Sequence, residues 1–519
     1  MEKRRGFIKR LFRFLFSRTF IVSLSLIMQL SGFVIIIWRF STSFFYFHLF
    51  FVVLSLTVVF YILNDNRINP AYKLAWIIPI LLAPIFGGFF YLTIGKTSTN
   101  RRFHNKLMFI DRRTRQELHQ DKLVMDSLEQ KSHDAARQAA YLQKYAHFPT
   151  CRNTTAQYLS PGESFFDCLK RELEQAKHYI FLEFFIIEGG RMWGDILEIL
   201  RRKASEGVDV RLIYDDVGCL HTLPYKYDQT MRRMGIKCSI FNPFRPVLSS
   251  SLNNRDHRKI VVIDGHTAFT GGVNLADEYI NQYEKHGHWK DAGILLKGDA
   301  VWNFTIMFLT MWNFLNTTED NYQKYLPHVH HSGSFDEDGY ITPYCDSPID
   351  GEPVGEQVYL NAISRARKSI CIETPYLIMD NATLTALRLA AKSGVDVRII
   401  TPGIPDKWYV HTMTRAHYSQ LLECGVRIYE YTPGFIHSKV VLVDDVFGVV
   451  GTINLDYRSL YLHFECAVWM YKTQAVLDAK RDFVETMALC REITMEDCRA
   501  VKWPVRFIRM AMRVFAPLM

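Results

Sequence analysis

Apolar residues gather near the N-terminus of this 519-residue chain in three runs, at residues 20–38, 44–63 and 74–94. Each run is close to the ~20 residues that a helix needs to cross a bilayer. A short polar link joins the second run to the third, which favours a helical hairpin. No small-residue cleavage site follows the first run, as a signal peptide would require. We therefore expect residues 1–95 to form membrane segments, with two or three true spans.

Basic residues flank this apolar region on both sides, within residues 3–18 and again within residues 96–115. Lysine and arginine next to a span favour the cytoplasmic face of the membrane. Both flanks can be cytoplasmic only if the number of spans is even. Either the first run lies in or re-enters the membrane, or one flank breaks the rule. The rest of the chain is expected on the cytoplasmic side of a multi-pass protein of the cell membrane.

Two helical segments lie on either side of the central part of the chain. Residues 96–148 are charged and helix-like, without strand signals, and predict a juxtamembrane helical linker. Residues 501–519 place Arg506, Arg509 and Arg513 at helical spacing among apolar residues. That pattern is typical of a basic amphipathic helix at a lipid surface, and a helix packed on the body of the protein is the alternative.

The central part contains an internal repeat. Residues 177–183, K-H-Y-I-F-L-E, return at residues 367–373 as R-K-S-I-C-I-E, and a G-V-D-V-R segment follows in both copies. Each half reads strand, helix, strand, helix and then a further apolar strand. This order indicates an α/β fold with largely parallel neighbouring strands. Two such halves in one chain, residues 149–335 and 336–500, imply a pseudo-twofold axis.

Both halves carry one motif, at residues 257–274 and 437–454. A histidine is followed by a lysine two residues later, then by an aspartate, a glycine and an asparagine at equal spacings in the two copies. These residues are His257, Lys259, Asp264 and Asn274 in the first copy, and His437, Lys439, Asp444 and Asn454 in the second. Side chains two apart share a strand face, so each histidine points with its lysine. Each aspartate falls on the opposite face or at the strand end, where we expect it to orient or support the catalytic groups.

Paired histidines and lysines suit chemistry on an anionic phosphodiester. One imidazole attacks phosphorus, the other protonates the leaving oxygen, and two ammonium groups hold the phosphoryl oxygens. An unperturbed pKa near ~6.5 lets histidine serve in either role, so spacing does not decide which one attacks. Asp291 and Glu465 precede apolar runs at matching places and suit partners for an imidazole Nδ1. Asn274 and Asn454 are expected to donate to phosphoryl oxygens or to the turn itself.

The composition indicates what kind of partner the protein binds and which cellular compartment it occupies. The formal net charge of +9 favours an anionic partner, either a lipid surface or nucleic acid. Ten cysteines are scattered without C-x-x-C spacing, as is typical of buried thiols in a reducing compartment. His328, His330 and His331 lie between the halves, but no matching ligands accompany them, and we expect no metal.

The duplicated pattern H-x-K-x4-D-x6-G-[GST]-x-N resembles the phospholipase D superfamily. Serine often follows the glycine in that signature, whereas Gly272 and Thr452 stand there in this chain. Further stretches are similar to the bacterial cardiolipin synthases, and these lie at residues 254–259, 289–291, 374–380 and 456–465. The resemblance covers the chain after residue 44. It implies two phospholipase D-like repeats related by a pseudo-twofold and preceded by N-terminal transmembrane helices.

The same resemblance implies a phosphatidyltransferase. His257 attacks and forms a phosphohistidine, while His437 acts as acid and then as base. The implied reaction breaks one phosphatidylglycerol, releases glycerol and passes the phosphatidyl group to a second phosphatidylglycerol, giving cardiolipin. It needs no metal or nucleotide cofactor. Its partners are phosphatidylglycerol and anionic membrane lipids, and no oligomeric state is indicated.

Other functions compete with this interpretation. A hydrolytic phospholipase D, or a transferase for a different alcohol, would use the same chemistry. A nuclease would too, but the three apolar runs argue against nucleic acid as a partner. A catalytically silent lipid-binding protein is disfavoured because His257, Lys259, His437 and Lys439 are all intact.

Overall fold

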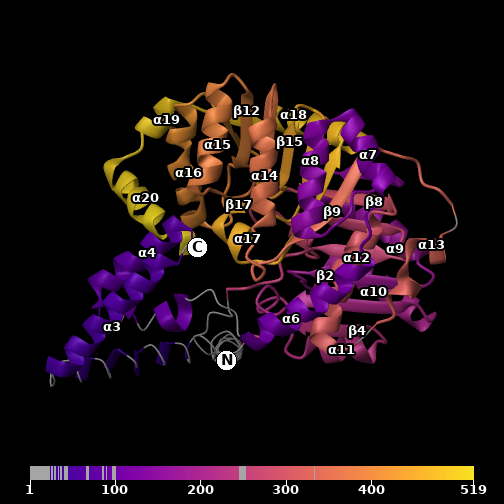
Figure 1. Ribbon diagram of the computed structural model, residues 1–519, viewed down its shortest axis with the longest axis horizontal. Coiled ribbons are helices and arrows are strands. Elements are labelled where there is room, and N and C mark those ends of the chain that lie inside the picture. Colours follow the sequence, from indigo (N-terminus) through magenta and orange to yellow (C-terminus); the bar gives the residue numbers. More distant parts are fainter. Residues whose placement is uncertain are drawn as a thin grey trace, which may run out of the picture.

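The computed structural model describes residues 45–65, 69–84, 87–88, 91–95, 101–244, 253–318, 320–331 and 333–518, with scattered positions between 24 and 39. Two α/β units lie side by side, one from each half of the sequence repeat, and the N-terminal helices project from one end of the pair (Figure 1). The first apolar run, residues 20–38, lies outside the continuously described residues.

The first half builds a seven-stranded sheet in the order β1-β8-β6-β5-β2-β3-β4. Its strands are β1 (Thr154–Leu159), β2 (Tyr179–Phe184), β3 (Asp209–Asp215), β4 (Lys237–Phe241), β5 (Ile260–Ile263), β6 (Thr267–Gly271) and β8 (Gly293–Gly298). Its helices are α9 (Gly162–Gln175), α10 (Arg191–Ser205), α11 (Tyr227–Arg233) and α12 (Val301–Asn316). The motif strand β5 is buried throughout, as its apolar sequence predicts.

The second half repeats this order as β9-β18-β16-β15-β10-β12-β13 and adds β19 at the edge. Its strands are β9 (Tyr340–Asp346), β10 (Ser369–Glu373), β12 (Asp396–Pro402), β13 (Arg427–Tyr431), β15 (Val440–Val443), β16 (Phe447–Gly451), β18 (Glu465–Tyr471) and β19 (Cys490–Ile493). Its helices include α14 (Val354–Arg365), α15 (Asn381–Lys392), α16 (Trp408–Leu422) and α18 (Gln474–Ala488). The two α/β repeats expected from the sequence are therefore confirmed.

The expectation of largely parallel neighbouring strands is wrong. In the first half β2–β3 and β3–β4 are parallel, whereas β2–β5, β5–β6, β6–β8 and β1–β8 are antiparallel. The parallel pairs are those that a helix connects. The motif strand β5 instead turns back directly into β6, and so short a connection permits only an antiparallel neighbour.

Each half ends in a helix that packs on the other half. Helix α12, which follows the first sheet, contacts β9 of the second, and α18 contacts β1 of the first. Helix α12 is buried around most of its circumference, as an apolar helix in the centre of a protein is. The two sheets therefore share one core, and a second apolar cluster belongs to the first half.

The segment at residues 96–148 is helical where it is described, and it packs on the catalytic body. It contains α6 (Arg101–Thr114), α7 (Lys122–Lys131) and α8 (His133–Tyr141). Helix α6 packs along α12, and Trp469 Nε1 donates to Gln138 Oε1 of α8 at 2.8 Å. Leu107 and Leu128 from these helices join the shared core.

The N-terminal and C-terminal helices meet at the second half. The second apolar run forms α3 (Phe45–Asn64), which packs on α4 (Pro70–Leu82). Asn69, at the start of α4, donates to Tyr461 Oη at 3.3 Å. The C-terminal helix α20 (Trp503–Phe515) packs on α16 and α4, and none of its residues is buried. Within the part of the chain that is described, no helix is both long and apolar enough to span a membrane.

Asp264 and Asp444, the motif aspartates, hold the strands together away from the histidines. Both have a left-handed backbone, with φ of 49° and 55°. The Asp264 carboxylate accepts backbone N–H bonds from residues 177–179 at 2.8 to 2.9 Å. Asp444 accepts them from residues 367–369 at 2.7 to 2.9 Å. Each aspartate thus clamps the start of β2 or β10, at the end of its motif strand that lies opposite the histidine.

We predict that Asp264→Ala destabilises the catalytic body by about 2–4 kcal/mol, because three backbone N–H groups lose their acceptor. Asp264→Asn should cost less, since asparagine tolerates the left-handed backbone and keeps one acceptor oxygen. The midpoint of thermal unfolding in detergent reports the change, with the exposed Asp336→Ala as control. Equal midpoints for Asp264→Ala and the control would contradict the clamp.

Candidate active site

The two histidine and lysine pairs lie just before the motif strands, where the two halves meet. His257 and Lys259 precede β5, and His437 and Lys439 precede β15. All four side chains are buried, with exposed fractions of 8%, 1%, 6% and 2% in that order. In both copies the lysine Nζ donates to the carbonyl oxygen of its own histidine, at 2.7 Å for Lys259. Each lysine therefore lies on the same side as its histidine.

Each imidazole is held by a carboxylate from the opposite half. His257 Nδ1 lies 2.9 and 3.0 Å from the two carboxylate oxygens of Glu465. His437 Nδ1 lies 2.7 Å from Asp291 Oδ2. Both carboxylates are fully buried. When the imidazole Nδ1 donates its proton to the carboxylate, Nε2 of each imidazole is available for phosphorus or for the leaving oxygen.

Backbone pairing between the two halves brings each motif histidine next to the carboxylate of the opposite half. Strand β14 (Gly434–Ile436) pairs in parallel with β7 (His288–Lys290), and His437 N donates to Lys290 O at 2.7 Å. On the other side, His257 N donates to Phe464 O at 2.9 Å. Each histidine is thus bonded through its backbone to the residue that precedes its carboxylate partner.

Burial gives the site neutral imidazoles and weakened ammonium groups. Desolvation lowers the pKa of Lys259 to about 8, against the opposing charge of Glu465, and that of Lys439 to about 7, against Asp291. Desolvation and the adjacent Lys439 also lower the pKa of His437 to about 4. The pKa of His257 falls well below its usual value through burial and the charge of Lys259. A phosphodiester anion between these groups would raise all four pKa values, because an opposite charge favours the protonated forms.

The pKa values of the two buried carboxylates shift in opposite directions. Burial raises the pKa of Glu465 well above its usual value, although Lys259 opposes the shift. Burial acts on Asp291 in the same direction, but His437 and Lys439 outweigh it and hold the pKa of Asp291 below its usual value. Asp291 is therefore an ionised partner that stabilises a protonated His437, whereas Glu465 favours a neutral His257.

The residue after each motif glycine lies against a buried carboxylate. A Cβ at Gly272 would lie 2.0 Å from Asp291 Oδ1, so a side chain there would displace the carboxylate. Thr452, at the matching position, donates its hydroxyl to Glu465 and accepts from Cys466 N at 3.0 Å. The contact with Asp291 thus accounts for glycine at position 272, and Thr452 keeps the hydroxyl that serine would supply.

The two motif asparagines differ in their hydrogen bonds. Asn274 accepts from Ile186 N at 3.0 Å and donates to Tyr279 Oη at 2.8 Å, so it is committed to the turn. Asn454 is buried, and its Oδ1 has no hydrogen-bond partner among the described residues. Of the two, Asn454 retains an uncommitted amide oxygen at the site.

Sequence reasoning overlooked the groups that support the motif from the neighbouring strands. Arg258 forms an ion pair with Glu183 at 2.5 Å, and Ser438 donates to Glu373 at 2.5 Å. Arg258 and Ser438 each follow a motif histidine. Glu183 is the penultimate residue of β2, and Glu373 is the last residue of β10. The sequence repeat at residues 177–183 and 367–373 could have predicted these two glutamates, because both copies end in a glutamate.

A third histidine, His463, lies against the first pair. Its ring centroid is 5.6 Å from that of His257, and its Nδ1 is 3.9 Å from Glu465 Oε1. In the described chain these three residues are the one group whose possible metal-ligating atoms all lie within 4.8 Å of one another, and residues 328–331 form no such group. Glu465 is already engaged by hydrogen bonds, and the charge of the nearby Lys259 would oppose a cation. The group therefore fits proton chemistry better than a metal.

Two family models match the chain. The model described as "Cardiolipin synthase, PLD-like domain" matches residues 169–289 and 359–487, one segment in each half. The model described as "Phospholipase_D-nuclease N-terminal" matches residues 53–96. Both copies of the motif fall within the matched segments, whereas the outer strands β1, β8, β9 and β19 lie outside them.

Relatives extend over most of the chain. An uncharacterized protein of Streptococcus mutans is 42% identical, over 89% of this chain and 99% of its own length. Cardiolipin synthases of Halalkalibacterium halodurans and Geobacillus kaustophilus are 33% and 34% identical, each over 91% of this chain and 94% of its own length. The crystal structure of phosphatidylserine synthase from Haemophilus influenzae shares the fold, with a TM-score of 0.54 at 15% identity over 74% of this chain and 100% of that one. The chain belongs to the cardiolipin synthase family of phosphatidyltransferases.

Proposed function

We propose that this protein transfers a phosphatidyl group from one phosphatidylglycerol to another, releasing glycerol and forming cardiolipin. One observation carries the proposal: two buried histidines, each with a lysine beside it, are each tied through Nδ1 to a carboxylate of the other half. The relatives named cardiolipin synthase support the same choice of reaction. The lipid partners are phosphatidylglycerol and other anionic membrane lipids.

His257 is the nucleophile of the first step. Its Nε2 attacks phosphorus, the bond from phosphorus to the glycerol oxygen breaks, and a phosphohistidine forms. His437 gives its proton to the departing oxygen. The ionised Asp291, 2.7 Å from His437 Nδ1, supports the role of His437 as the acid. Lys259 and Lys439 stabilise the charge that develops on the phosphoryl oxygens.

His437 is the base of the second step. It takes the proton of a glycerol hydroxyl on the second phosphatidylglycerol, and the oxygen of that hydroxyl attacks phosphorus. The bond from phosphorus to His257 breaks, and both histidines return to their first protonation states. One phosphodiester bond is made for each one broken, so no metal or nucleotide is required. Asn274, Asp264 and Asp444 support the surrounding turns.

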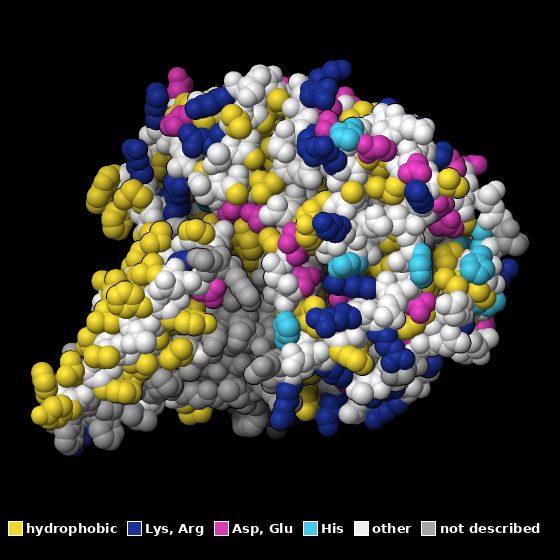
Figure 2. Space-filling view, in the orientation of Figure 1, with side chains coloured by type: hydrophobic (Ala, Val, Ile, Leu, Met, Phe, Trp, Pro, Cys, Tyr) yellow, Lys and Arg dark blue, Asp and Glu magenta, His cyan; other side chains and the backbone are white. Residues whose placement is uncertain are grey.

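In this proposal the protein is a multi-pass protein of the cell membrane, with its catalytic halves on the cytoplasmic side. Figure 2 shows apolar side chains covering α3 and α4 and gathering again at α20. On α20, Trp503, Phe507 and Met510 are 75%, 55% and 63% exposed. Their spacings of four and three residues put them on one helix face, and such a face with arginines beside it suits a lipid surface.

A hydrolytic phospholipase D is the second candidate, because water can attack the same phosphohistidine. The burial of His257 and His437 favours transfer over hydrolysis, since a closed site limits the access of water.

Product analysis separates the two candidates. In phosphatidylglycerol vesicles the purified protein is expected to form cardiolipin and glycerol in equal amounts, measured by lipid mass spectrometry and a glycerol assay. Phosphatidic acid in place of cardiolipin would identify a hydrolase. Protein carrying both His257→Ala and His437→Ala controls for contaminating enzymes.

The two histidines are expected to act as one unit. His257→Ala and His437→Ala should each lower turnover by roughly 10³-fold or more, nearly as far as the double variant, because each removes a group that the same reaction requires. The initial rate of cardiolipin formation measures the loss. His133→Ala, an exposed histidine of α8, is the control. A single variant that kept a tenth of the activity would count against the mechanism.

The apolar face of α20 is expected to present the protein to the lipid surface. Replacing Trp503, Phe507 and Met510 together by serine should lower cardiolipin formation on vesicles several-fold and raise the share of phosphatidic acid. Hydrolysis of a soluble short-chain phosphodiester should not change. Leu389→Ser, a residue 65% exposed on α15, controls for the loss of an exposed apolar side chain. If the rate and the product ratio on vesicles do not change, α20 only packs on the protein and does not present it to the lipid surface.

A further inference from the structure

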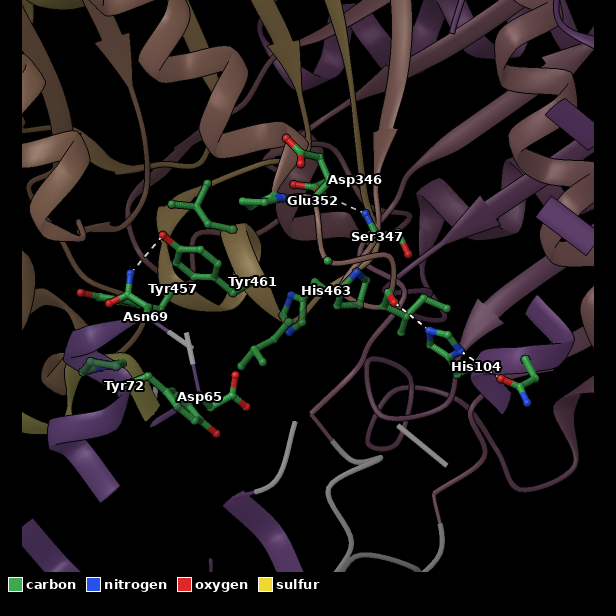
Figure 3. A pocket seen from close by; sticks show the side chains of 18 of the residues that line it. Asp65, Asn69, Tyr72, His104, Asp346, Ser347, Glu352, Tyr457, Tyr461 and His463 are labelled. Atoms are coloured by element: carbon green, nitrogen blue, oxygen red, sulfur yellow. Dashed lines mark hydrogen bonds between the residues drawn. The ribbon is translucent and has the colours of Figure 1, made fainter. Parts of the chain in front are cut away.

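A cavity of about 690 Å³ lies between the N-terminal helices and the second half (Figure 3). Residues of α3, α4, α6 and α17 (Tyr457–Tyr461) line it, together with the loop at residues 346–353. His463 borders the cavity and lies beside His257 of the active site. The volume is within the range of small-molecule sites, so the cavity has room for a ligand next to the reaction centre.

The lining of this cavity suits a neutral polyol. The described lining residues carry hydroxyl, amide, carboxyl and imidazole groups and contain no lysine or arginine, and they include Tyr61, Asn69, Tyr72, Glu352, Tyr461 and His463. Among the described residues of the lining a phosphate group would meet no lysine or arginine, whereas Lys259 and Lys439 supply two cations at the reaction centre. Hydroxyl groups both donate and accept hydrogen bonds, so a polyol complements the polar groups of this lining. Ile349, Leu460 and Leu462 also line the cavity and leave room for the carbon atoms of a lipid headgroup.

His463 is a buried polar side chain of the cavity lining with unmade hydrogen bonds. It is 9% exposed, and neither ring nitrogen has a hydrogen-bond partner. Burial lowers the pKa of its imidazole well below the usual value, and the charges of Arg458 and Arg255 add to the shift, so the ring is neutral. A neutral imidazole offers one donor and one acceptor. That pair complements an alcohol, whereas an ammonium ion cannot accept the N–H.

Backbone pairing places His463 on the same side as the catalytic partner Glu465. Phe464 N donates to Arg255 O at 2.8 Å, and His257 N donates to Phe464 O at 2.9 Å. Residues 463–465 thus run alongside residues 255–257. Since side chains two apart in an extended segment share a face, His463 and Glu465 both point toward His257. A hydroxyl bound to His463 is therefore held near the phosphorus on which His257 acts.

We propose that this cavity binds the glycerol headgroup of the acceptor lipid and that His463 forms a hydrogen bond with one of its hydroxyls. The proposal rests on the transferase activity proposed above and names the place where that activity recognises its acceptor. His463 acts as a positioning residue and exchanges no proton with the substrate. Its hydrogen bond forms when the headgroup enters, as many bonds at active sites tighten only in the complex.

Competition between two three-carbon alcohols tests the proposal. Purified protein in phosphatidylglycerol vesicles receives deuterated glycerol and 1-propanol at equal concentrations. Mass spectrometry measures the deuterated phosphatidylglycerol and the phosphatidylpropanol formed. We expect the wild type to prefer glycerol and His463→Phe to lower the glycerol-to-propanol ratio by about fivefold to tenfold, the effect of one lost hydrogen bond. His463→Gln keeps a donor and an acceptor and should retain most of the preference.

The ratio separates recognition of the alcohol from general damage to the site. If His463 only supports Glu465 and His257, His463→Phe slows transfer to both alcohols and to water equally, and the unchanged ratio overturns the proposal. His417→Phe is the matched control, since His417 is a buried histidine whose Nδ1 bonds to Met413 O at 3.0 Å, outside the cavity lining. This control should leave the ratio at the wild-type value.

Three further outcomes bear on the assignment. Ethanolamine at the same concentration should not displace glycerol, and preferential formation of phosphatidylethanolamine would assign the cavity to an ammonium ion and overturn the polyol. If the wild-type protein forms neither cardiolipin nor any exchange product, both the proposed transferase activity and this inference are wrong. Normal transfer with the same ratio in wild type and His463→Phe overturns the headgroup site alone.

Discussion

The rest of the structure depends on two hydrogen bonds, each between a motif histidine of one half and a carboxylate of the other half. His257 is completed by Glu465 and His437 by Asp291, so neither half contains a working imidazole on its own. The two sheets must therefore dock in one relative position. Helices α12 and α18 fix that position by packing reciprocally on the first strand of the opposite sheet. The shared core is thus a requirement of the chemistry as well as of stability.

Without a bound anion, burial disfavours the protonated forms of the lysines and histidines at this site. Two lysines and two histidines lie within a dry interface, and desolvation weakens the protonated form of each. An anionic phosphodiester supplies the missing negative charge and restores those protons. In the proposed reaction the same anion would also favour the protonation of His437, beside the ionised Asp291. Lys259 and Lys439 would then supply the positive charge that the phosphoryl oxygens require.

The sequence predicts the local parts of this arrangement better than the contacts between them. The alternation in the motif placed Lys259 on the side of His257, and the repeat predicted two equivalent α/β halves. The strands β1, β6 and β8 were missed because short antiparallel returns carry little periodicity, which led to the wrong expectation of a largely parallel sheet. The crossed pairing could not be read from spacing, since Glu465 stands closer in sequence to His437 than to His257. His463 was overlooked because it occurs in one half and so has no repeat to mark it.

The proposed membrane attachment and the proposed acceptor site involve the same helices. The walls of the cavity come partly from α3 and α4, and Asn69 at the start of α4 bonds to Tyr461 of α17 in the second half. Helix α20 packs on α4, so the surface proposed to face lipid and the surface that lines the cavity belong to one assembly. In the proposed mechanism the phosphohistidine reacts with water or with an alcohol according to which group is held in place when the first product leaves. A lipid headgroup held in the cavity would react before water, and the fold would then favour transfer over hydrolysis without any change in the two motif histidines.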